Sequence, residues 1–286
     1  MEDLYKRKFS GLAVRRYFCY FVLILLTLFS LFPFYVLIIN ATRTHAQIQK
    51  GFSFLPGTNF FRNLAHLMAD KETPILMALF NSVFVSVMCA VLTTYFSSMT
   101  AYGVYMYKFK GRDFAFKFIL AVMMIPTQVS TLGFLKLLEK IGMLDNLASL
   151  YIPAIASPVV FFYMFQAMQS TLPFSIVEAA RVDGCNEFRT FNQIVIPMMK
   201  PAIAVQAIFS FVSSWNNYFV PALVIDSGSK KTIPILIAEL RNKDYANFDM
   251  GKVYMTICIA IIPLVIIYLI LSKSIIKGAT QGGVKE

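Results

Sequence analysis

Residues 172–197 read LPFSIVEAARVDGCNEFRTFNQIVIP and lie between two long apolar runs of the chain. The stretch carries five charged side chains, Glu178, Arg181, Asp183, Glu187 and Arg189. Ionised side chains are costly to expose to lipid. We therefore expect the stretch to be an aqueous loop between two membrane spans.

Local signals in this loop predict two short helices joined by a bend. Ser175 and Glu178 have the spacing of a capping box at the start of the first helix. Gly184 stands where a helix stop needs a left-handed residue, Asn186 is suited to cap a second helix, and Pro197 is suited to end it. The loop should fold as a compact helical hairpin.

The second predicted helix has an apolar face. Phe188, Phe191 and Val195 recur along it at helical spacing. A helix this short is marginal in water without a surface to pack on. We expect that surface to belong to another protein.

Composition indicates an all-α integral membrane protein. Of the 286 residues, 58% are hydrophobic and only 14% are charged, against roughly 25% charged in soluble domains. The net charge of +11 comes from Lys and Arg in short connections between apolar runs. Membrane topology and anionic lipid explain such a distribution, and a nucleic-acid partner is not expected.

Six transmembrane helices are predicted within a single transmembrane domain over residues 1–286, with the hairpin between the fourth and the fifth. A span needs about 20 apolar residues, and suitable runs lie near residues 17–39, 75–101, 118–135, 150–169, 201–225 and 253–271. The basic residues before the first span and at Lys108, Lys110 and Arg112 favour the cytoplasmic side. Both termini, including a tail at 272–286, should then be cytoplasmic.

Two outer connections and one kinked span complete the expected topology. Residues 40–73 should form an outer loop with a short interfacial helix, and residues 226–252 a charged outer loop. Pro126 should kink the third span, and Gln128 beside it should face protein or a cavity. Gln128 could either stabilise packing between helices or contact a substrate, and the sequence favours neither role.

An aromatic and amide cluster lies in the fifth predicted span. Trp215, Asn216, Asn217 and Tyr218 fall within about one helical turn. Rings pack on the apolar face of a sugar and amides bond its hydroxyls. An interfacial aromatic belt with amides bonded between helices has the same composition, so both interpretations remain.

Sequence signals for chemistry by the chain itself are missing. The four cysteines are dispersed, and His45 and His66 lie in the first outer loop, where solvated side chains are expected. No metal site is predicted. The only Gly-Lys pair, Gly251-Lys252, lacks the rest of a phosphate-binding loop. An enzyme, and an ATPase in particular, is therefore not expected.

The hairpin resembles the EAA signature of membrane subunits of binding-protein-dependent ABC importers. The match consists of Glu178-Ala179-Ala180, Gly184 after three residues, Ile194 after nine more, and Ile196-Pro197, where the usual pattern has Leu in place of Ile196. The resemblance covers nearly the whole chain. It extends to the W-N pair in the fifth span and to the closing GATQGGVKE, and it is closest to the smaller membrane subunit of maltose-type systems.

This resemblance implies a permease subunit that imports a sugar or related solute across the bacterial plasma (inner) membrane. It implies that the hairpin is a coupling helix that docks on a cytoplasmic ATPase through Glu178, Ala179, Ala180, Asp183, Gly184, Phe188 and Pro197. The implied partners are a second homologous permease subunit, a dimer of ATPase subunits, an extracytoplasmic sugar-binding protein and membrane lipid. ATP and Mg would bind at the ATPase subunits, and this chain would bind no cofactor.

Two other functions are compatible with parts of the pattern. An ion-coupled secondary transporter would work without ATP, but usually needs a buried acid or base within a span, and none is seen. A membrane scaffold could use the same hairpin to bind partners, but would not need the polar cluster at residues 215–218.

Overall fold

The computed structural model describes residues 2–70, 74–242 and 248–283, with side chains described for residues 13–70, 74–242 and 248–270. Every regular element in these ranges is helical, as expected for an all-α protein. In chain order they are α1 (Glu2–Ala41), α2 (His45–Gln49), α3 (Phe60–Ala69), α4 (Ile75–Met106), α5 (Arg112–Met123), α6 (Thr127–Lys140), α7 (Ala148–Tyr151), η1 (Ile152–Ile155), α8 (Pro158–Thr171), α9 (Phe174–Val182), α10 (Glu187–Thr190), the π-helical turn η2 (Phe191–Val195), α11 (Ile196–Met198), α12 (Lys200–Trp215), α13 (Phe219–Val224), η3 (Gly228–Lys230), α14 (Ile233–Arg241) and α15 (Met250–Gly283).

The chain divides into two compact units, Met1–Ala69 with Asp244–Ile259, and Asp70–Lys243 with Ala260–Glu286. In the first unit, a buried polar cluster closes the loop after α1. Arg43, which is 8% exposed, donates to Asn40 Oδ1 at 3.1 Å and to the carbonyl of Gly51 at 3.0 Å. Asn63 of α3 donates to the carbonyl of Ala41 at 2.8 Å. These bonds satisfy carbonyls and a charge that would otherwise be buried without a partner.

The first outer loop contains the short helix expected from its sequence, α3 (Phe60–Ala69). One expectation for this loop is wrong. His45 is not a solvated loop residue, since it opens α2, its ring packs edge-on to Phe248, and its Nδ1 accepts a hydrogen bond from the backbone N–H of Met250 at 3.1 Å.

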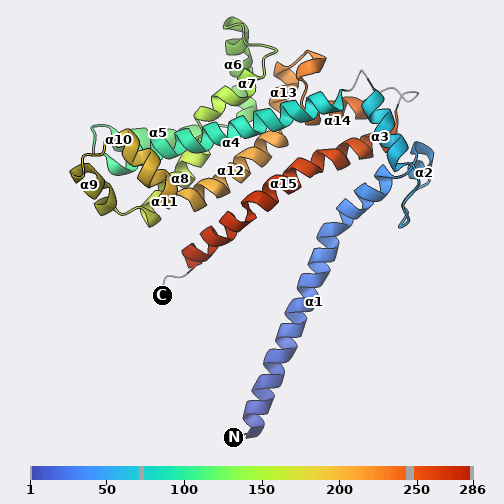
Figure 1. Cartoon of the computed structure of the whole chain (residues 1–286), viewed down its shortest axis with the longest axis horizontal. Coiled ribbons are helices and arrows are strands. Elements are labelled where there is room, and N and C mark those ends of the chain that lie inside the picture. The colour runs from blue at the N-terminus through green and yellow to red at the C-terminus, as the bar shows by residue number, and fades with distance from the viewer. Residues whose placement is uncertain (1, 71–73, 243–247, 284–286) are drawn as a thin grey trace. The chain divides into compact units, whose positions relative to one another are not determined.

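The second unit is built along α4, with α8 and α12 packed against it (Figure 1). Small buried residues recur on α4 at intervals of four, at Ala78, Ser82, Ser86 and Ala90. Small side chains let neighbouring helices approach closely in a membrane. Hydroxyls on the same helix bond across to its neighbours, as Thr93 does to the carbonyl of Ala154 at 3.0 Å.

Four helical segments are long and apolar enough to cross a membrane, namely Ala13–Ala41, Ile75–Met106, Ala148–Thr171 and Met250–Ile270. Two further pairs reach that length and composition only if each bent pair is one span, which gives four to six candidate spans in the part of the chain that the structure describes.

The predicted third span at residues 118–135 is more than kinked. α5 and α6 meet at 99°, so the pair is a broken span or a re-entrant loop. Pro126 has no N–H and disfavours helical backbone at the residue before it. α5 ends accordingly in two tight bonds, Met124 N–H to Ala121 and Ile125 N–H to Val122, both at 3.1 Å.

The predicted fifth span at 201–225 is also interrupted, because α12 ends at Trp215 and α13 begins at Phe219. At 1.5 Å per residue, the 16 residues of α12 extend about 24 Å, short of the roughly 30 Å hydrocarbon core. Between the two helices, Asn217 Oδ1 accepts a hydrogen bond from the N–H of Val220 at 3.4 Å, which gives one donor in the first turn of α13 a partner.

The predicted tail at 272–286 is helical over most of its length, because α15 continues to Gly283. Residues 284–286 lie outside the described part of the chain.

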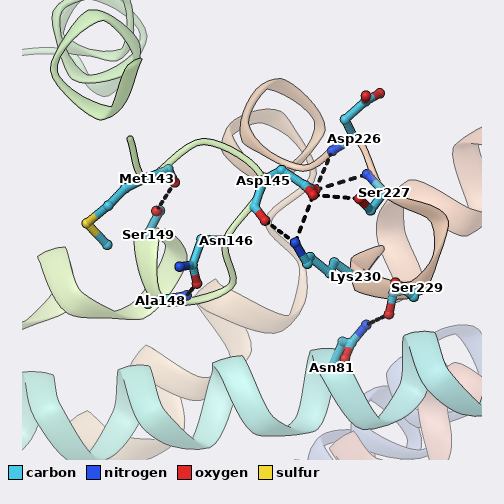
Figure 2. Close-up of polar contacts among 10 residues, drawn as sticks. All are labelled: Asn81, Met143, Asp145, Asn146, Ala148, Ser149, Asp226, Ser227, Ser229 and Lys230. Carbon is cyan, nitrogen blue, oxygen red and sulfur yellow. Dashed lines mark hydrogen bonds and ion pairs between the residues drawn. The ribbon is translucent and has the colours of Figure 1, made fainter. Parts of the chain in front are cut away.

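Near the N-terminal half of α4, one carboxylate joins two loops (Figure 2). Asp145 Oδ1 accepts from the N–H groups of Asp226 at 3.1 Å and Ser227 at 2.9 Å, and Oδ2 lies 2.8 Å from Lys230 Nζ. Asn81 of α4 donates to the carbonyl of Ser229 at 2.9 Å. We call Asp145, Ser227 and Lys230 the Asp145 cluster. The loop after α6 and the loop after α13 are therefore held together although they are about 80 residues apart.

Candidate functional site: an exposed hairpin and a polar cavity

The first arm of the hairpin is α9, which ends in a Schellman turn at Gly184. Gly184 has φ of +78°, its N–H bonds the carbonyl of Arg181 at 3.0 Å, and Cys185 N–H bonds the carbonyl of Ala180 at 3.0 Å. These are the two bonds of the motif, and the left-handed residue in it is usually glycine. The predicted bend at Gly184 is confirmed.

The predicted capping box at the start of α9 is wrong. Pro173 occupies the N-cap position with no side-chain cap, and Ser175 lies inside the helix. Proline presets the backbone there, so the helix begins at Phe174, two residues earlier than a Ser175 cap would allow.

The second arm begins as expected, with Asn186 as N-cap accepting from the N–H of Arg189 at 2.8 Å. The expected apolar face divides in two, since Phe191 and Val195 are buried in the core of the unit while Phe188 is 69% exposed. Pro197 does not end the arm, which continues to Met198. Pro197 cannot donate to Gln193, and the preceding turn widens to a π-turn in which Ile196 N–H bonds the carbonyl of Phe191.

A polar network fastens the hairpin to the end of α4. Tyr102 donates to Glu187 Oε2 at 2.8 Å, Arg181 Nε lies 2.7 Å from Glu187 Oε1, and the Arg181 guanidinium lies over the ring of Tyr107 at 5.3 Å. Burial raises the pKa of Glu187, but the hydrogen bonds from Arg181, Tyr107 and Tyr102 lower it more, so its pKa falls below the usual value. The charged carboxylate is therefore the form that this network stabilises.

The outer surface of the hairpin combines unpartnered charge with exposed apolar side chains. Val182 is 88% exposed and Phe188 is 69% exposed. Glu178 and Asp183 are also exposed, and within the described part of the chain their side chains make no hydrogen bond or ion pair. Of the EAA residues, Ala179 is exposed, while Ala180 is 5% exposed and packs inward.

A cavity of about 790 Å³ lies between α4, the segment 150–163 and α12. One stripe of polar side chains lines it, at Gln206, Ser210, Ser213 and Ser214 of α12 and at Asn217 just beyond the end of that helix. Gln206, Ser210, Ser213 and Asn217 follow one another at intervals of four, three and four, and Ser214 adjoins Ser213, so the five lie on one side of the segment. This stripe was missed from the sequence because small hydroxyl residues within an apolar helix are equally typical of helix packing.

The predicted aromatic and amide cluster is only partly assembled. Trp215 is 3% exposed and stacks on Phe211 at 5.7 Å, with Ala90 in the same core, so it packs between helices. Asn217 lines the cavity, whereas Asn216 and Tyr218 are exposed and do not line it. Gln128 is exposed in the first turn of α6 and does not line it either.

In the described ranges, no three His, Cys, Asp or Glu side chains lie close enough together to hold a metal ion.

A set of apolar spans, a cavity with one polar stripe and an exposed hairpin defines a membrane transport component. The model of one family, "Binding-protein-dependent transport system inner membrane component", matches residues 93–277. The chain belongs to this family. It is a multi-pass membrane protein and one component of a transport complex.

Several transport proteins are similar to this chain over most of its length. The arabinooligosaccharides transport system permease protein AraQ of Bacillus subtilis is 34% identical over 91% of this chain and 92% of its own length. The lactose transport system permease protein LacG of Rhizobium radiobacter is 30% identical over 91% and 93%. A bacterial ABC transporter involved in the import of the acidic polysaccharide alginate has a chain with the same fold, with a TM-score of 0.77 at 24% identity over 90% of this chain and 96% of that chain.

Proposed function

We propose that this chain is a membrane-spanning permease subunit of an ATP-driven sugar importer, coupled to separate ATPase subunits by the hairpin at 172–197. Family membership supports the import role, and the sugar class follows from relatives whose names specify arabinooligosaccharides and lactose. A glycerol-3-phosphate permease, UgpE of Yersinia pestis, is 27% identical over 91% of the chain, so the class includes related solutes.

The observation that carries the proposal is the exposed tip of the hairpin. Exposed apolar side chains beside charged ones mark a protein interaction surface. Val182 and Phe188 would enter a cleft on the ATPase, and Glu178 would pair with a basic residue there. ATP and Mg would bind at that partner.

The proposed mechanism is mechanical. The Schellman turn at Gly184 and the Glu187 network make the hairpin one rigid body with the end of α4. Closure of the ATPase dimer would move that body, and this chain and a homologous second permease would then shift between inward and outward openings. A sugar-binding protein would deliver the solute on the outer side. The hairpin and both termini are cytoplasmic in this arrangement.

The test is uptake by the complete transporter in proteoliposomes, with and without enclosed ATP. We expect sugar uptake only with ATP, and a loss of about tenfold or more on Phe188→Ala, since a buried anchor contributes about 2 kcal/mol or more to an interface. Phe54→Ala is the matched control, because Phe54 is 66% exposed but lies in the first outer loop. Uptake on an ion gradient without ATP, or normal uptake by Phe188→Ala, would overturn the proposal.

A further inference from the structure

The lining of the 790 Å³ cavity contains no charged residue. Its volume lies within the roughly 300–1,000 Å³ of ordinary small-ligand sites. Besides the stripe on α12, the segment 150–163 and α4 contribute the hydroxyls of Ser157 and Thr93. Neutral hydrogen-bonding groups therefore form the polar part of the surface.

One of these groups lacks a hydrogen-bond partner within the described part of the chain. Gln206 is 8% exposed, and its amide makes no hydrogen bond within the described part of the chain. Its amide is not among the fully buried side-chain atoms without a partner, which in the described residues belong to Ser86, Thr190 and Thr232, so the amide is accessible from the cavity. Because Gln206 lines the cavity, a solute there can both donate to its carbonyl oxygen and accept from its NH2 group.

Neighbouring groups extend the same chemistry. Ser210 and Ser213, one and two turns further along α12, also make no side-chain hydrogen bond among the described residues. Asn217 accepts one bond from Val220 and keeps its NH2 group available. Tyr163 and Phe209 line the cavity with rings that are 54% and 64% exposed, which suits the apolar face of a sugar ring.

We propose that this cavity binds a neutral, polyhydroxylated solute through Gln206, Ser210, Ser213 and Asn217, and discriminates against phosphorylated and uronic-acid solutes. A carboxylate or phosphate would lose its hydration here without gaining a cationic partner from this chain, and such desolvation is expensive. The inference rests on the proposed function and narrows it, because known members of this fold handle both neutral and acidic glycans.

The test is direct binding to the assembled transporter in detergent, without the sugar-binding protein, by equilibrium dialysis. The probes are radiolabelled arabinotriose, maltotriose and raffinose, which are neutral, and trigalacturonate, which has the same length with three carboxylates. We expect at least one neutral probe to bind saturably. The affinity for trigalacturonate should be lower by about tenfold or more, as for an ion that lacks a counter-charge.

Two variants connect the binding to Gln206. Gln206→Leu should lower the affinity for the neutral probe by about tenfold, as when a site loses a hydrogen-bonding group. Gln206→Asn should recover most of that affinity. Gln166→Leu on α8 is the matched control, because Gln166 is exposed and outside the cavity lining, and it should bind as wild type.

Outcomes of this experiment are separable from those of the uptake test. Equal or tighter binding of trigalacturonate, unchanged binding by Gln206→Leu, or no binding of any neutral probe would overturn the inference. ATP-driven import of an acidic glycan at the rate of a neutral one would overturn it too, while leaving the importer function in place. Absence of any ATP-driven uptake would instead remove the proposed function.

Discussion

At Gly184 the backbone requires a conformation that other residues adopt only with strain. Its φ of +78° is left-handed, and a Cβ built there would meet no atom within 4 Å. A side chain at this position would therefore strain the backbone and could clash with a docked partner. It would not clash with other residues of this chain. The residue's two neighbouring hydrogen bonds set the angle between the hairpin arms.

We predict that Gly184→Val loosens this turn by about 1–2 kcal/mol, the cost of a left-handed residue with a side chain. Sugar uptake per ATP hydrolysed should fall, because the hairpin would no longer move as one body. Uptake and phosphate release measured on the same proteoliposomes test this. Gly228→Ala is the control, since Gly228 has open space around it and an ordinary φ; an unchanged uptake ratio for Gly184→Val would contradict the prediction.

Among elements, the contact between the hairpin and α4 depends on Glu187. It bonds Tyr102 of α4 and Arg181 of α9 at once, and therefore connects both arms to the long helix. Arg181 is held charged, with its pKa raised chiefly by its hydrogen bond to Glu187. The side chains of Arg181 and Glu187 are 36% and 42% exposed, so solvent screens part of their attraction.

A double-mutant cycle of Tyr102→Phe and Glu187→Gln should reveal this coupling. Each single change is expected to destabilise by about 1 kcal/mol, and the double change by less than the sum because both remove one bond. Thermal unfolding in detergent is the measurement. Tyr163→Phe, at a tyrosine outside the network, is the control; additive effects would show that the bond contributes nothing.

The same network predicts a pH dependence. Because the folded pKa of Glu187 is lowered from 4.5, its contribution is complete above the unfolded pKa and is lost as pH falls through the lower folded value. Wild type should therefore lose stability below about pH 4.5, and Glu187→Gln should lose less over that window. If wild type and Glu187→Gln lost stability in parallel as the pH falls, the predicted contribution of Glu187 would be wrong.

At the other end of α4, the Asp145 cluster should control access to the loop after α13. Hydrogen bonds from Lys230 and Ser227 hold the pKa of Asp145 below its usual range, so the cluster is ionised near neutral pH. Asp145→Asn keeps the left-handed backbone that Asn tolerates and removes the charge. We expect faster tryptic cleavage after Lys230, with Asp226→Asn, whose exposed side chain makes no bond among the described residues, as control. Equal cleavage of the two variants would contradict this.

For the whole molecule, the proposed orientation places Cys185 in the cytoplasm. Cys185 is partly exposed on the hairpin, whereas Cys89 is buried. A membrane-impermeant maleimide should label Cys185 in inside-out vesicles stripped of the ATPase but not in intact cells. Cys185→Ser should abolish that signal, and labelling from outside would reverse the topology.

The hairpin shows how far sequence reasoning reached. Gly184 and Asn186 were predictable because each acts through its own backbone conformation or nearest N–H groups. Phe191 and Val195 were misplaced, because helical spacing predicts which residues share a face, but not which part of that face the rest of the protein covers. Likewise the sequence left Trp215 open to contact with a solute or to packing between helices, and its burial against Phe211 and Ala90 shows the packing role.

The sequence by itself determined that the chain is an all-helical membrane protein with an aqueous, charged hairpin, because apolar run length and the cost of charge in lipid are local properties. Only the tertiary structure decided where the third and fifth spans break, which α12 face lines a cavity, and which acid fastens the hairpin. Those outcomes depend on contacts between residues distant in the chain, such as Tyr102 with Glu187, and no spacing along one segment specifies them.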